Sequence, residues 1–283
     1  MPESISRSAI EALAAELNTA AECGLAVPTP SSRPEFTSSG FTLNDAYAVE
    51  EILKLGRESA GHKSVGRKVG YANKAMWRVL KLETLVWAHM YEDTVHHAAN
   101  NSATLTLRNT RSLKIEPEIV FGAKQTFTSQ PLDASAALAA ADWLALGFEI
   151  IDCPYPDWKF QPADFVASFG LHAALIVGDK IPISADRIPQ LLEELARFKL
   201  RMLKGRERQL VEEGSGKNSL KSPALCLAEL GAAIARRFPN ELLSAGEIVS
   251  SGTLTAGHLT APGDLWTAEV EGISLPPLTL ALA

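Results

Sequence analysis

The chain has 283 residues, of which 46% are hydrophobic and 21% are charged, and its formal net charge is −6. This composition predicts a folded chain with a sizeable core, and it argues against extended disorder. An acidic chain without a dense block of Lys and Arg also argues against sequence-independent nucleic-acid binding, which depends on clustered positive charge.

Two helices are expected at the N-terminal end. Apolar residues recur at helical spacing from residue 8 to residue 21. A proline-rich stretch over residues 27–40 is typical of a connector, and a second helix begins at Thr42, whose side chain can cap it. We therefore expect residues 1–62 to form an N-terminal helical segment and residues 63–283 to form one larger domain.

The pattern then changes to short strands and turns. In the segment 64–71, glycines lie on both sides of Arg67-Lys68, which allows close approach of the backbone to a neighbour or a ligand. Lys68 is therefore a candidate pocket residue, although a solvated lysine explains the pattern as well. A short helix over 75–82 and a loop entering a strand over 83–95 follow, and the latter contains His89.

Two carboxylates lie two residues apart in the apolar run 115–121. Because strand side chains alternate between faces, Glu116 and Glu118 would project from the same side. A second apolar run, 146–152, contains Glu149. Burying an ionised carboxylate is costly without a compensating charge, so these three residues predict a bound cation, Mg²⁺ first and Mn²⁺ next. The alternative is that Glu116 and Glu118 form the solvated face of an amphipathic strand.

The rest of the chain alternates helices with strands. A helix over 133–146, with an Asp cap and Gly147 at its end, would lead directly to Glu149. His172 is expected to be a hydrogen-bonded structural histidine. Further elements are a hairpin over 197–211, a helix over 222–237, and strands over 248–255 and 265–270. This order of helices and strand groups predicts the α+β class with a mixed sheet.

Cysteines and apolar runs indicate the compartment. The three cysteines lie far apart, which suits neither a disulfide framework nor a thiolate zinc site, so we expect a reducing cytoplasm. The first 21 residues contain acidic residues instead of a basic region followed by an apolar run, so no signal peptide is expected. No apolar run is long enough to span a bilayer, so we expect no membrane association.

Nine short segments occur in an order known from one group of enzymes. They are DAYAV at 45–49, GRKVG at 66–70, KAM at 74–76, IEPEIVF at 115–121, EIID at 149–152, DWK at 157–159, DFVA at 164–167, SGTLT at 251–255 and PGD at 262–264. Together they resemble the fumarylacetoacetate hydrolase superfamily, and within it the branch of 2-keto-4-pentenoate hydratase and 4-oxalocrotonate decarboxylase. The resemblance covers roughly residues 45 to 270.

This resemblance implies a fold and a set of site residues. The fold would be a mixed β-sheet roll of the fumarylacetoacetate hydrolase type, with residues 63–283 as the catalytic domain. The metal ligands would be Glu116, Glu118 and Glu149, and the cation would chelate the carboxylate and 2-keto oxygens of a 2-oxo acid. Lys68 would transfer protons or stabilise the enolate. Residues expected to bind substrate are Arg67, Tyr71, Lys159 and Thr253.

The sequence departs from the family pattern at three places: at Val86, at Thr253, and at residues 169–172, where FGLH replaces the polar, small-residue run expected downstream of Trp158-Lys159. Relatives carry an acidic residue where this chain has Val86, and His89 is a candidate for replacement acid and base chemistry, with a surface or structural histidine as the alternative. The usual Ser of the SGSLT-like segment is Thr253, which keeps the hydroxyl.

Three functions are consistent with these residues. We expect a Mg²⁺-dependent hydratase that adds water to a 2-hydroxy-2,4-dienoate to give a 4-hydroxy-2-oxo acid, in the catabolism of aromatic meta-cleavage products. The first alternative is a decarboxylase of a 4-oxalocrotonate-like 2-oxo-3-enedioate, with Arg67 and Arg78 as candidates to bind the distal carboxylate. The second is a non-catalytic metal-binding partner subunit. The resemblance also implies a homo-oligomer, or a complex with a paralogous hydratase or decarboxylase.

Overall fold

The computed structural model describes residues 5–37, 40–128 and 130–283. Its strands are β1 (Ser64–Gly70), β2 (Val86–Tyr91), β3 (Val95–His97), β4 (Ser102–Leu105), β5 (Leu113–Ala123), β6 (Ala141–Asp152), β7 (His172–Val177), β8 (Ile181–Pro182), β9 (Lys199–Lys204), β10 (Gln209–Ser215), β11 (Ile248–Ser250), β12 (His258–Thr260), β13 (Leu265–Glu271) and β14 (Leu278–Leu282).

The helices lie mostly before and between these strands. The α-helices are α1 (Arg7–Cys23), α2 (Pro34–Thr37), α3 (Leu43–Ser59), α4 (Lys74–Leu80), α5 (Ala134–Ala139), α6 (Pro162–Ala167), α7 (Ile188–Arg197) and α8 (Pro223–Arg237). Short 3₁₀ turns are η1 (Pro30–Ser32), η2 (Pro156–Trp158), η3 (Phe169–Leu171), η4 (Ala185–Arg187) and η5 (Gly216–Asn218).

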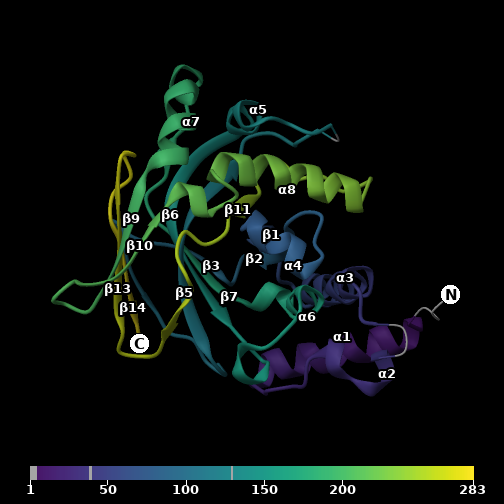
Figure 1. The fold of residues 1–283 in the computed structure, drawn as a ribbon. Coiled ribbons are helices and arrows are strands. Elements are labelled where there is room, and N and C mark those ends of the chain that lie inside the picture. The colour runs from purple at the N-terminus through teal and green to yellow at the C-terminus, as the bar shows by residue number, and fades with distance from the viewer. Residues whose placement is uncertain (1–4, 38–39, 129) are drawn as a thin grey trace.

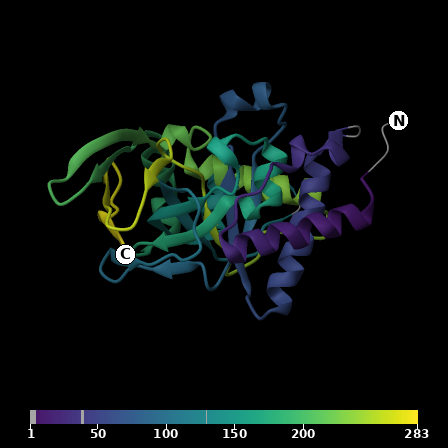
Figure 2. The ribbon, with the colours of Figure 1, turned by 90° about the horizontal axis from the view of Figure 1, so that it is seen from below.

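The strands form two sheets (Figure 1). The larger sheet has the order β2-β1-β11-β5-β6-β7-β3, and β12 and β8 extend it beside β5 and β6. The smaller sheet has the order β10-β9-β13-β14-β4 and lies at the end of the molecule away from the N-terminus, as the two views in Figures 1 and 2 show. Both sheets contain parallel and antiparallel pairs, which is the mixed arrangement expected from the sequence.

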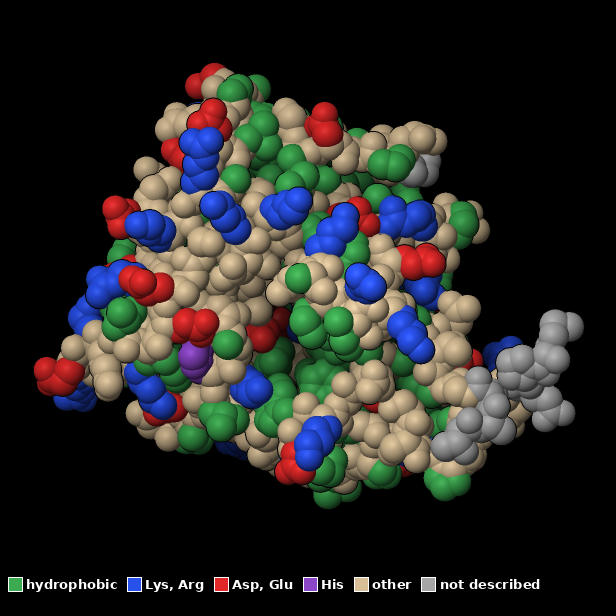
Figure 3. Space-filling model, viewed as in Figure 1, with side chains coloured by type: hydrophobic (Ala, Val, Ile, Leu, Met, Phe, Trp, Pro, Cys, Tyr) green, Lys and Arg blue, Asp and Glu red, His purple; other side chains and the backbone are tan. Residues whose placement is uncertain are grey.

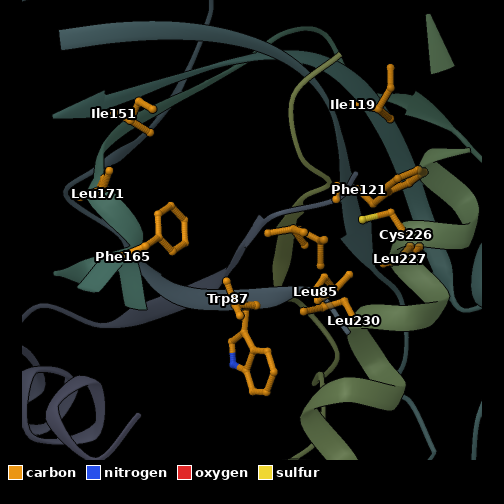
Figure 4. Close-up of a cluster of buried hydrophobic side chains, with 14 of the residues drawn as sticks. Leu85, Trp87, Ile119, Phe121, Ile151, Phe165, Leu171, Cys226, Leu227 and Leu230 are labelled. Carbon is orange, nitrogen blue, oxygen red and sulfur yellow. The ribbon is translucent and has the colours of Figure 1, made fainter. Parts of the chain in front are cut away.

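The long hairpin of β5 and β6 is the centre of the larger sheet. The two strands pair from Leu113 opposite Asp152 to Ala123 opposite Ala141. Most of their apolar side chains are buried, and Ile119, Phe121 and Phe148 are fully so. Helix α8 covers one part of this core, where Leu227 and Leu230 approach Leu85 and Phe121 (Figure 4). A carboxylate on these strands is therefore held in a rigid and largely apolar setting.

The N-terminal helices form where the sequence predicts them. Thr42 and Asp45 form a capping box at the start of α3. Buried residues of α1 and α3, such as Leu17 and Leu53, belong to the same hydrophobic core as the sheet. The division between residues 62 and 63 stays a prediction. No helix in the described part of the chain is long and apolar enough to cross a membrane.

The helix predicted over 133–146 is wrong in its second half. Asp133 caps a helix that ends at Ala139, and β6 already begins at Ala141. The alanine-rich sequence favours a helix locally, but pairing with β5 and burial of Leu144 and Leu146 override this weak preference. The strand expected over 248–255 is also shorter, because β11 ends at Ser250.

Other predicted elements agree with the structure. The hairpin appears as β9 and β10, and α8 begins after the capping residue Ser222 with Pro223 in its first turn. Helix α7 and the strands β12 and β14 had not been predicted.

Candidate active site

Three glutamates meet on the central hairpin. Glu116 and Glu118 project from one face of β5, and Glu149 projects from the neighbouring strand β6, directly opposite Glu116. Each offers a carboxylate oxygen, and these oxygens all lie within 4.8 Å of one another. The structure thus brings together the three residues that the sequence singles out as metal ligands.

Glu118 has one satisfied and one unsatisfied oxygen. Its Oε2 accepts hydrogen bonds from the Ser250 hydroxyl and, at 2.8 Å, from the Gly252 N–H. Its Oε1 is buried and has no hydrogen-bond partner among the described residues. A buried carboxylate oxygen without a partner is costly, and a cation would satisfy it. The donor set therefore fits a divalent metal ion.

Glu149 is held from two sides. His172 Nδ1 lies 2.8 Å from its Oε1, and Lys68 Nζ lies 3.0 Å from its Oε2. Burial opposes ionisation, but the positive charge of Lys68 and the hydrogen bond from His172 outweigh it and hold the pKa of Glu149 below its usual value. Glu149 is therefore the member of the three that ionises most readily.

The other two glutamates resist ionisation without a counter-charge. Burial raises the pKa of Glu116 to about 7, with Lys68 opposing the shift and Glu149 adding to it. Burial also raises the pKa of Glu118 well above its usual value, and repulsion from Glu149 and Glu116 adds to this. A divalent cation would compensate the charges that the chain itself leaves unbalanced.

Lys68 is a fully buried lysine that points at the three glutamates. It lies on β1, and its side chain is only 2% exposed. Besides its ion pair with Glu149, Nζ donates to the Gly170 carbonyl at 2.9 Å and lies 4.7 Å from the centre of the Phe165 ring. Gly170 has a φ of 60°, and a Cβ atom there would come within 2.8 Å of Lys68 Cδ. Glycine at this position therefore leaves the space that the lysine chain occupies.

A cavity of about 770 Å³ opens beside Lys68 and Glu116. A hollow is visible near the centre of the face drawn in Figure 3, where acidic and hydrophobic side chains show between basic ones. Its apolar wall contains Trp158, Phe160 and Phe165. The cavity also has a basic lining, which consists of Lys74, Lys114, Lys217 and Lys221 besides Lys68. This combination suits an anionic ligand with an apolar middle.

Strained backbone surrounds this cavity. Five non-glycine lining residues have positive φ angles: Tyr71, Trp158, Leu171, Leu220 and Lys221. A left-handed conformation costs about 1–2 kcal/mol per residue for side chains other than glycine. Strain of this kind persists where the surrounding structure imposes it, often at functional sites.

Two of the four residues predicted to bind substrate, Tyr71 and Thr253, line the cavity. The Lys159 side chain is 82% exposed and lies 3.4 Å from Asp157, and it is not among the cavity's lining residues. Its neighbours Trp158 and Phe160 line the cavity instead.

Arg67 and His89 lie away from the three glutamates. In the β1–β2 register Arg67 stands opposite His89, and Lys68 stands opposite Ala88, so strand alternation sends Arg67 and Lys68 to opposite faces. Arg67 forms ion pairs with Glu241 and Glu247, and His89 Nδ1 lies 2.5 Å from Glu50 Oε1. Neither residue lines the cavity, so the structure does not support their expected contact with substrate.

Val86 and Arg78 are also outside this cavity. Val86 is buried and lines a separate pocket with Trp87 and Arg237, and Arg78 is exposed on α4. Besides Glu116, the cavity's lining among the described residues contains one other carboxylate, that of Glu212, which comes from β10 and not from the segment around Val86.

Some site residues could not be found by sequence reasoning. Lys114 precedes Glu116 by two residues, so the same alternation places it on the same face and could have indicated it. Lys217, Lys221 and Glu212 come from β10 and the turn after it, and no sequence spacing links them to the glutamates. His172 was expected to be a hydrogen-bonded histidine, but no sequence spacing indicated that its partner is Glu149.

Comparison with known proteins gives the family context. A 4-oxalocrotonate decarboxylase from Pseudomonas sp. (strain CF600) is 27% identical over 232 residues, which cover 82% of this chain and 83% of that protein. A 2-hydroxyhexa-2,4-dienoate hydratase from Comamonas testosteroni is 27% identical over 250 residues, 87% of each chain. These similarities confirm the branch predicted from the sequence, and both named activities agree with the predicted lyase class. No family model matches the chain.

Solved structures show the same fold. The 4-oxalocrotonate decarboxylase from Pseudomonas putida G7, complexed with magnesium and adipate, superimposes with a TM-score of 0.86 at 24% identity, covering 99% of this chain and all of that one. A yeast protein of the fumarylacetoacetate hydrolase family is more distant, with a TM-score of 0.54 at 12% identity over 77% of this chain and 92% of its own. The fold is therefore of the predicted fumarylacetoacetate hydrolase type.

Proposed function

From this similarity to decarboxylases and hydratases, we propose that the chain is a divalent-cation-dependent lyase acting on a 2-oxo acid. The supporting observation is the convergence of Glu116, Glu118 and Glu149 beside Lys68, at a cavity with a basic lining. We expect these glutamates to hold Mg²⁺, with Mn²⁺ as the next choice, because both prefer hard oxygen ligands. When bound, the cation would stabilise negative charge on the 2-keto oxygen.

Lys68 is the residue we expect to act on the reacting atoms. Its Nζ is fixed by Glu149 and the Gly170 carbonyl, and so needs no reorientation to donate to an oxygen that gains negative charge. Trp158 and Phe165 would flank the unsaturated middle of the substrate and exclude water from it. Tyr71 and Thr253 would orient the substrate through their hydroxyl groups.

The lysines around the cavity favour decarboxylation as the specific reaction. A 2-oxo-3-enedioate carries a second carboxylate, and Lys74, Lys217 and Lys221 offer positive charge on the cavity lining. In this reaction the bond between the distal carboxylate carbon and its neighbour breaks. The electron pair moves through the C=C bond to the 2-keto oxygen, and CO₂ leaves. We therefore propose a decarboxylase of a 4-oxalocrotonate-like substrate, which reverses the preference drawn from the sequence alone.

Hydration of a 2-hydroxy-2,4-dienoate is the second candidate, with one observation in its favour. Glu212 lines the cavity, and its Oε2 lies 2.6 Å from His258 Nε2. A carboxylate paired with a histidine could accept a proton from an attacking water molecule. This substrate has a single carboxylate, so it gives the lysines around the cavity no distal group to bind.

Turnover assays separate the candidates. The purified protein with Mg²⁺ is incubated with 4-oxalocrotonate while CO₂ is measured, and separately with 2-hydroxypenta-2,4-dienoate while its ultraviolet absorbance is followed. We expect CO₂ release that EDTA abolishes. Loss of the dienoate absorbance without CO₂ release would support the hydratase. Binding of Mg²⁺ without turnover of either compound would contradict both and support a non-catalytic partner subunit.

A further inference from the structure

His172 occupies an unusual position next to the three glutamates. Its side chain is 2% exposed, and its two ring nitrogens contact Glu149 and Thr94. Neither His172 nor Thr94 lines the 770 Å³ cavity, so neither is placed to touch a substrate there. Any effect of His172 on that site must therefore act through Glu149.

A β-bulge gives His172 this direction. In the β6–β7 register Glu149 stands opposite Leu175 and Ile150 opposite Ala174, but Ile151 stands opposite His172. One residue of β7 is thus skipped. In a regular strand, His172 would lie on the face opposite to Leu175, because the two residues are three apart, and Leu175 shares its face with its partner Glu149. The bulge brings His172 to the face of Glu149. Bulges commonly redirect a side chain in this way beside active sites.

Polar contacts of the His172 ring connect Glu149 to Thr94. A carboxylate can only accept, so Nδ1 must donate to Glu149 Oε1 at 2.8 Å. On the other side of the ring, the Thr94 hydroxyl oxygen lies 3.0 Å from Nε2, and the Tyr91 N–H donates to the same oxygen at 3.3 Å. Both ring nitrogens of His172 are therefore held, one by Glu149 and the other by Thr94.

Thr94 is itself anchored by the backbone. Its hydroxyl also lies 3.0 Å from the Tyr91 carbonyl, and its own carbonyl accepts from the Leu175 N–H at 2.8 Å. Thr94 therefore joins the end of β2 to β7 and fixes the far side of the imidazole ring. Lys68 forms an ion pair with the other oxygen of Glu149, Oε2, which accepts no hydrogen bond from the described residues.

We propose that His172, held by Thr94, is a positioning residue that sets the orientation of Glu149 for metal binding. The inference rests on the proposed role of Glu149 as a metal ligand. Histidine and carboxylate partners behind metal ligands orient them, and their loss typically lowers metal affinity about 10- to 100-fold.

Magnesium binding by calorimetry on the full chain tests this proposal with matched variants. His172→Ala should weaken Mg²⁺ binding about 10- to 100-fold. His172→Asn should restore much of the affinity, because its side-chain amide nitrogen can take the place of Nδ1. Thr94→Val should also weaken binding, and Thr94→Ser, which keeps the hydroxyl, should not.

A kinetic readout separates positioning from a direct role in the reaction. Saturating Mg²⁺ should restore kcat in His172→Ala, since the ring does not touch the reacting atoms. A kcat that stays low at saturating Mg²⁺ would contradict the proposal, as would a folded His172→Ala variant with unchanged affinity. If that variant does not fold, equal Mg²⁺ affinity of Thr94→Val and Thr94→Ser overturns the proposal.

Glu149→Gln distinguishes this failure from failure of the metal site. Weak Mg²⁺ binding by Glu149→Gln together with normal binding by His172→Ala would overturn only the positioning role. Normal Mg²⁺ binding by Glu149→Gln would remove Glu149 from the metal site, and the positioning role of His172 would fall with it.

Discussion

Glu116 of β5 stands directly opposite Glu149 of β6 in the antiparallel register of the central hairpin. Like charges in this relation destabilise a sheet. Lys68 pairs with Glu149, but Glu118 adds a third carboxylate on the same face. The arrangement makes sense if the three side chains share a cation, and it makes the stability of the metal-free protein a test of the site.

Glu116→Gln should act in opposite directions on stability and on metal binding. Above about pH 7, the raised pKa of Glu116, removing one of two opposed charges should raise the free energy of unfolding of the metal-free protein by about 0.2–1 kcal/mol. Losing an anionic ligand should weaken Mg²⁺ binding. Urea unfolding in EDTA and calorimetry measure the two effects, with the exposed Glu213→Gln as a control that should change neither. A variant with lower stability and unchanged affinity would contradict the assignment.

Lys68→Met should lower turnover without removing the metal site. Methionine fills a similar volume but cannot donate to a developing oxyanion, so kcat should fall by roughly 10²–10⁴-fold. Mg²⁺ affinity should be unchanged or higher, because a positive charge next to the metal ligands is lost. Steady-state kinetics at saturating Mg²⁺ check the first effect and calorimetry the second. Normal kcat in this variant would exclude Lys68 from the reaction.

Gly252→Ala should damage the metal site through the backbone. Gly252 has a φ of 88°, its N–H donates to Glu118, and an added Cβ atom would come within 2.7 Å of the Ala72 Cβ. We expect weaker Mg²⁺ binding together with a stability loss of about 1 kcal/mol or more. Gly263→Ala is the matched control, because its φ of 91° is similar but no atom lies within 4 Å of its Cβ position. Equal Mg²⁺ affinity in both variants would argue against the Glu118 contact.

These residues also show how much of the site can be predicted from the sequence. Strand alternation correctly placed Glu116 and Glu118 on one face, and the apolar run around Glu149 indicated the third carboxylate, which the family resemblance also implied. The same alternation should have warned that the adjacent residues Arg67 and Lys68 cannot both face one pocket on a regular strand. The contact of His172 with Glu149 depends on a bulge in β7, and no local sequence pattern indicates it. Register and bulges are set by tertiary pairing, which a single sequence specifies only indirectly.

The buried cluster behind β1 should make stability depend on pH. The ring of His89, whose Nε2 lies 3.4 Å from Glu241 Oε1, and the charge of Arg67 lower the pKa of Glu241 to about 2 against the effect of burial. Burial favours neutral His89, but Glu50 and Glu241 outweigh it and raise the pKa of His89 above its usual 6.5. Glu241 therefore stabilises the fold above about pH 4.5 and loses this effect as the pH falls toward 2. His89 stabilises it below about pH 6.5 and loses this effect as the pH rises through its raised pKa.

His89→Gln tests this dependence. The free energy of unfolding from urea titrations should fall between pH 6.5 and 9 in the unaltered protein, and this fall should be smaller in the variant. The Mg²⁺ affinity at pH 7.5 should stay the same, because His89 does not line the cavity. Parallel pH profiles for the two proteins would show that His89 does not titrate with folding.

Lys217→Met and Lys221→Met should discriminate between a dicarboxylate and a monocarboxylate substrate. Both lysines are exposed residues on the cavity lining. Solvent screens an ion pair between either lysine and a distal carboxylate, so each variant should raise KM for 4-oxalocrotonate by roughly 2- to 5-fold. The increase should shrink as salt is added, since screening weakens exposed charge pairs. Binding of 2-hydroxypenta-2,4-dienoate should not change, and Lys124→Met, an exposed lysine outside the cavity, should affect neither compound. An equal change in KM for both compounds, or no change for either, would show that these lysines do not recognise a distal carboxylate. The argument for decarboxylation over hydration would then be lost.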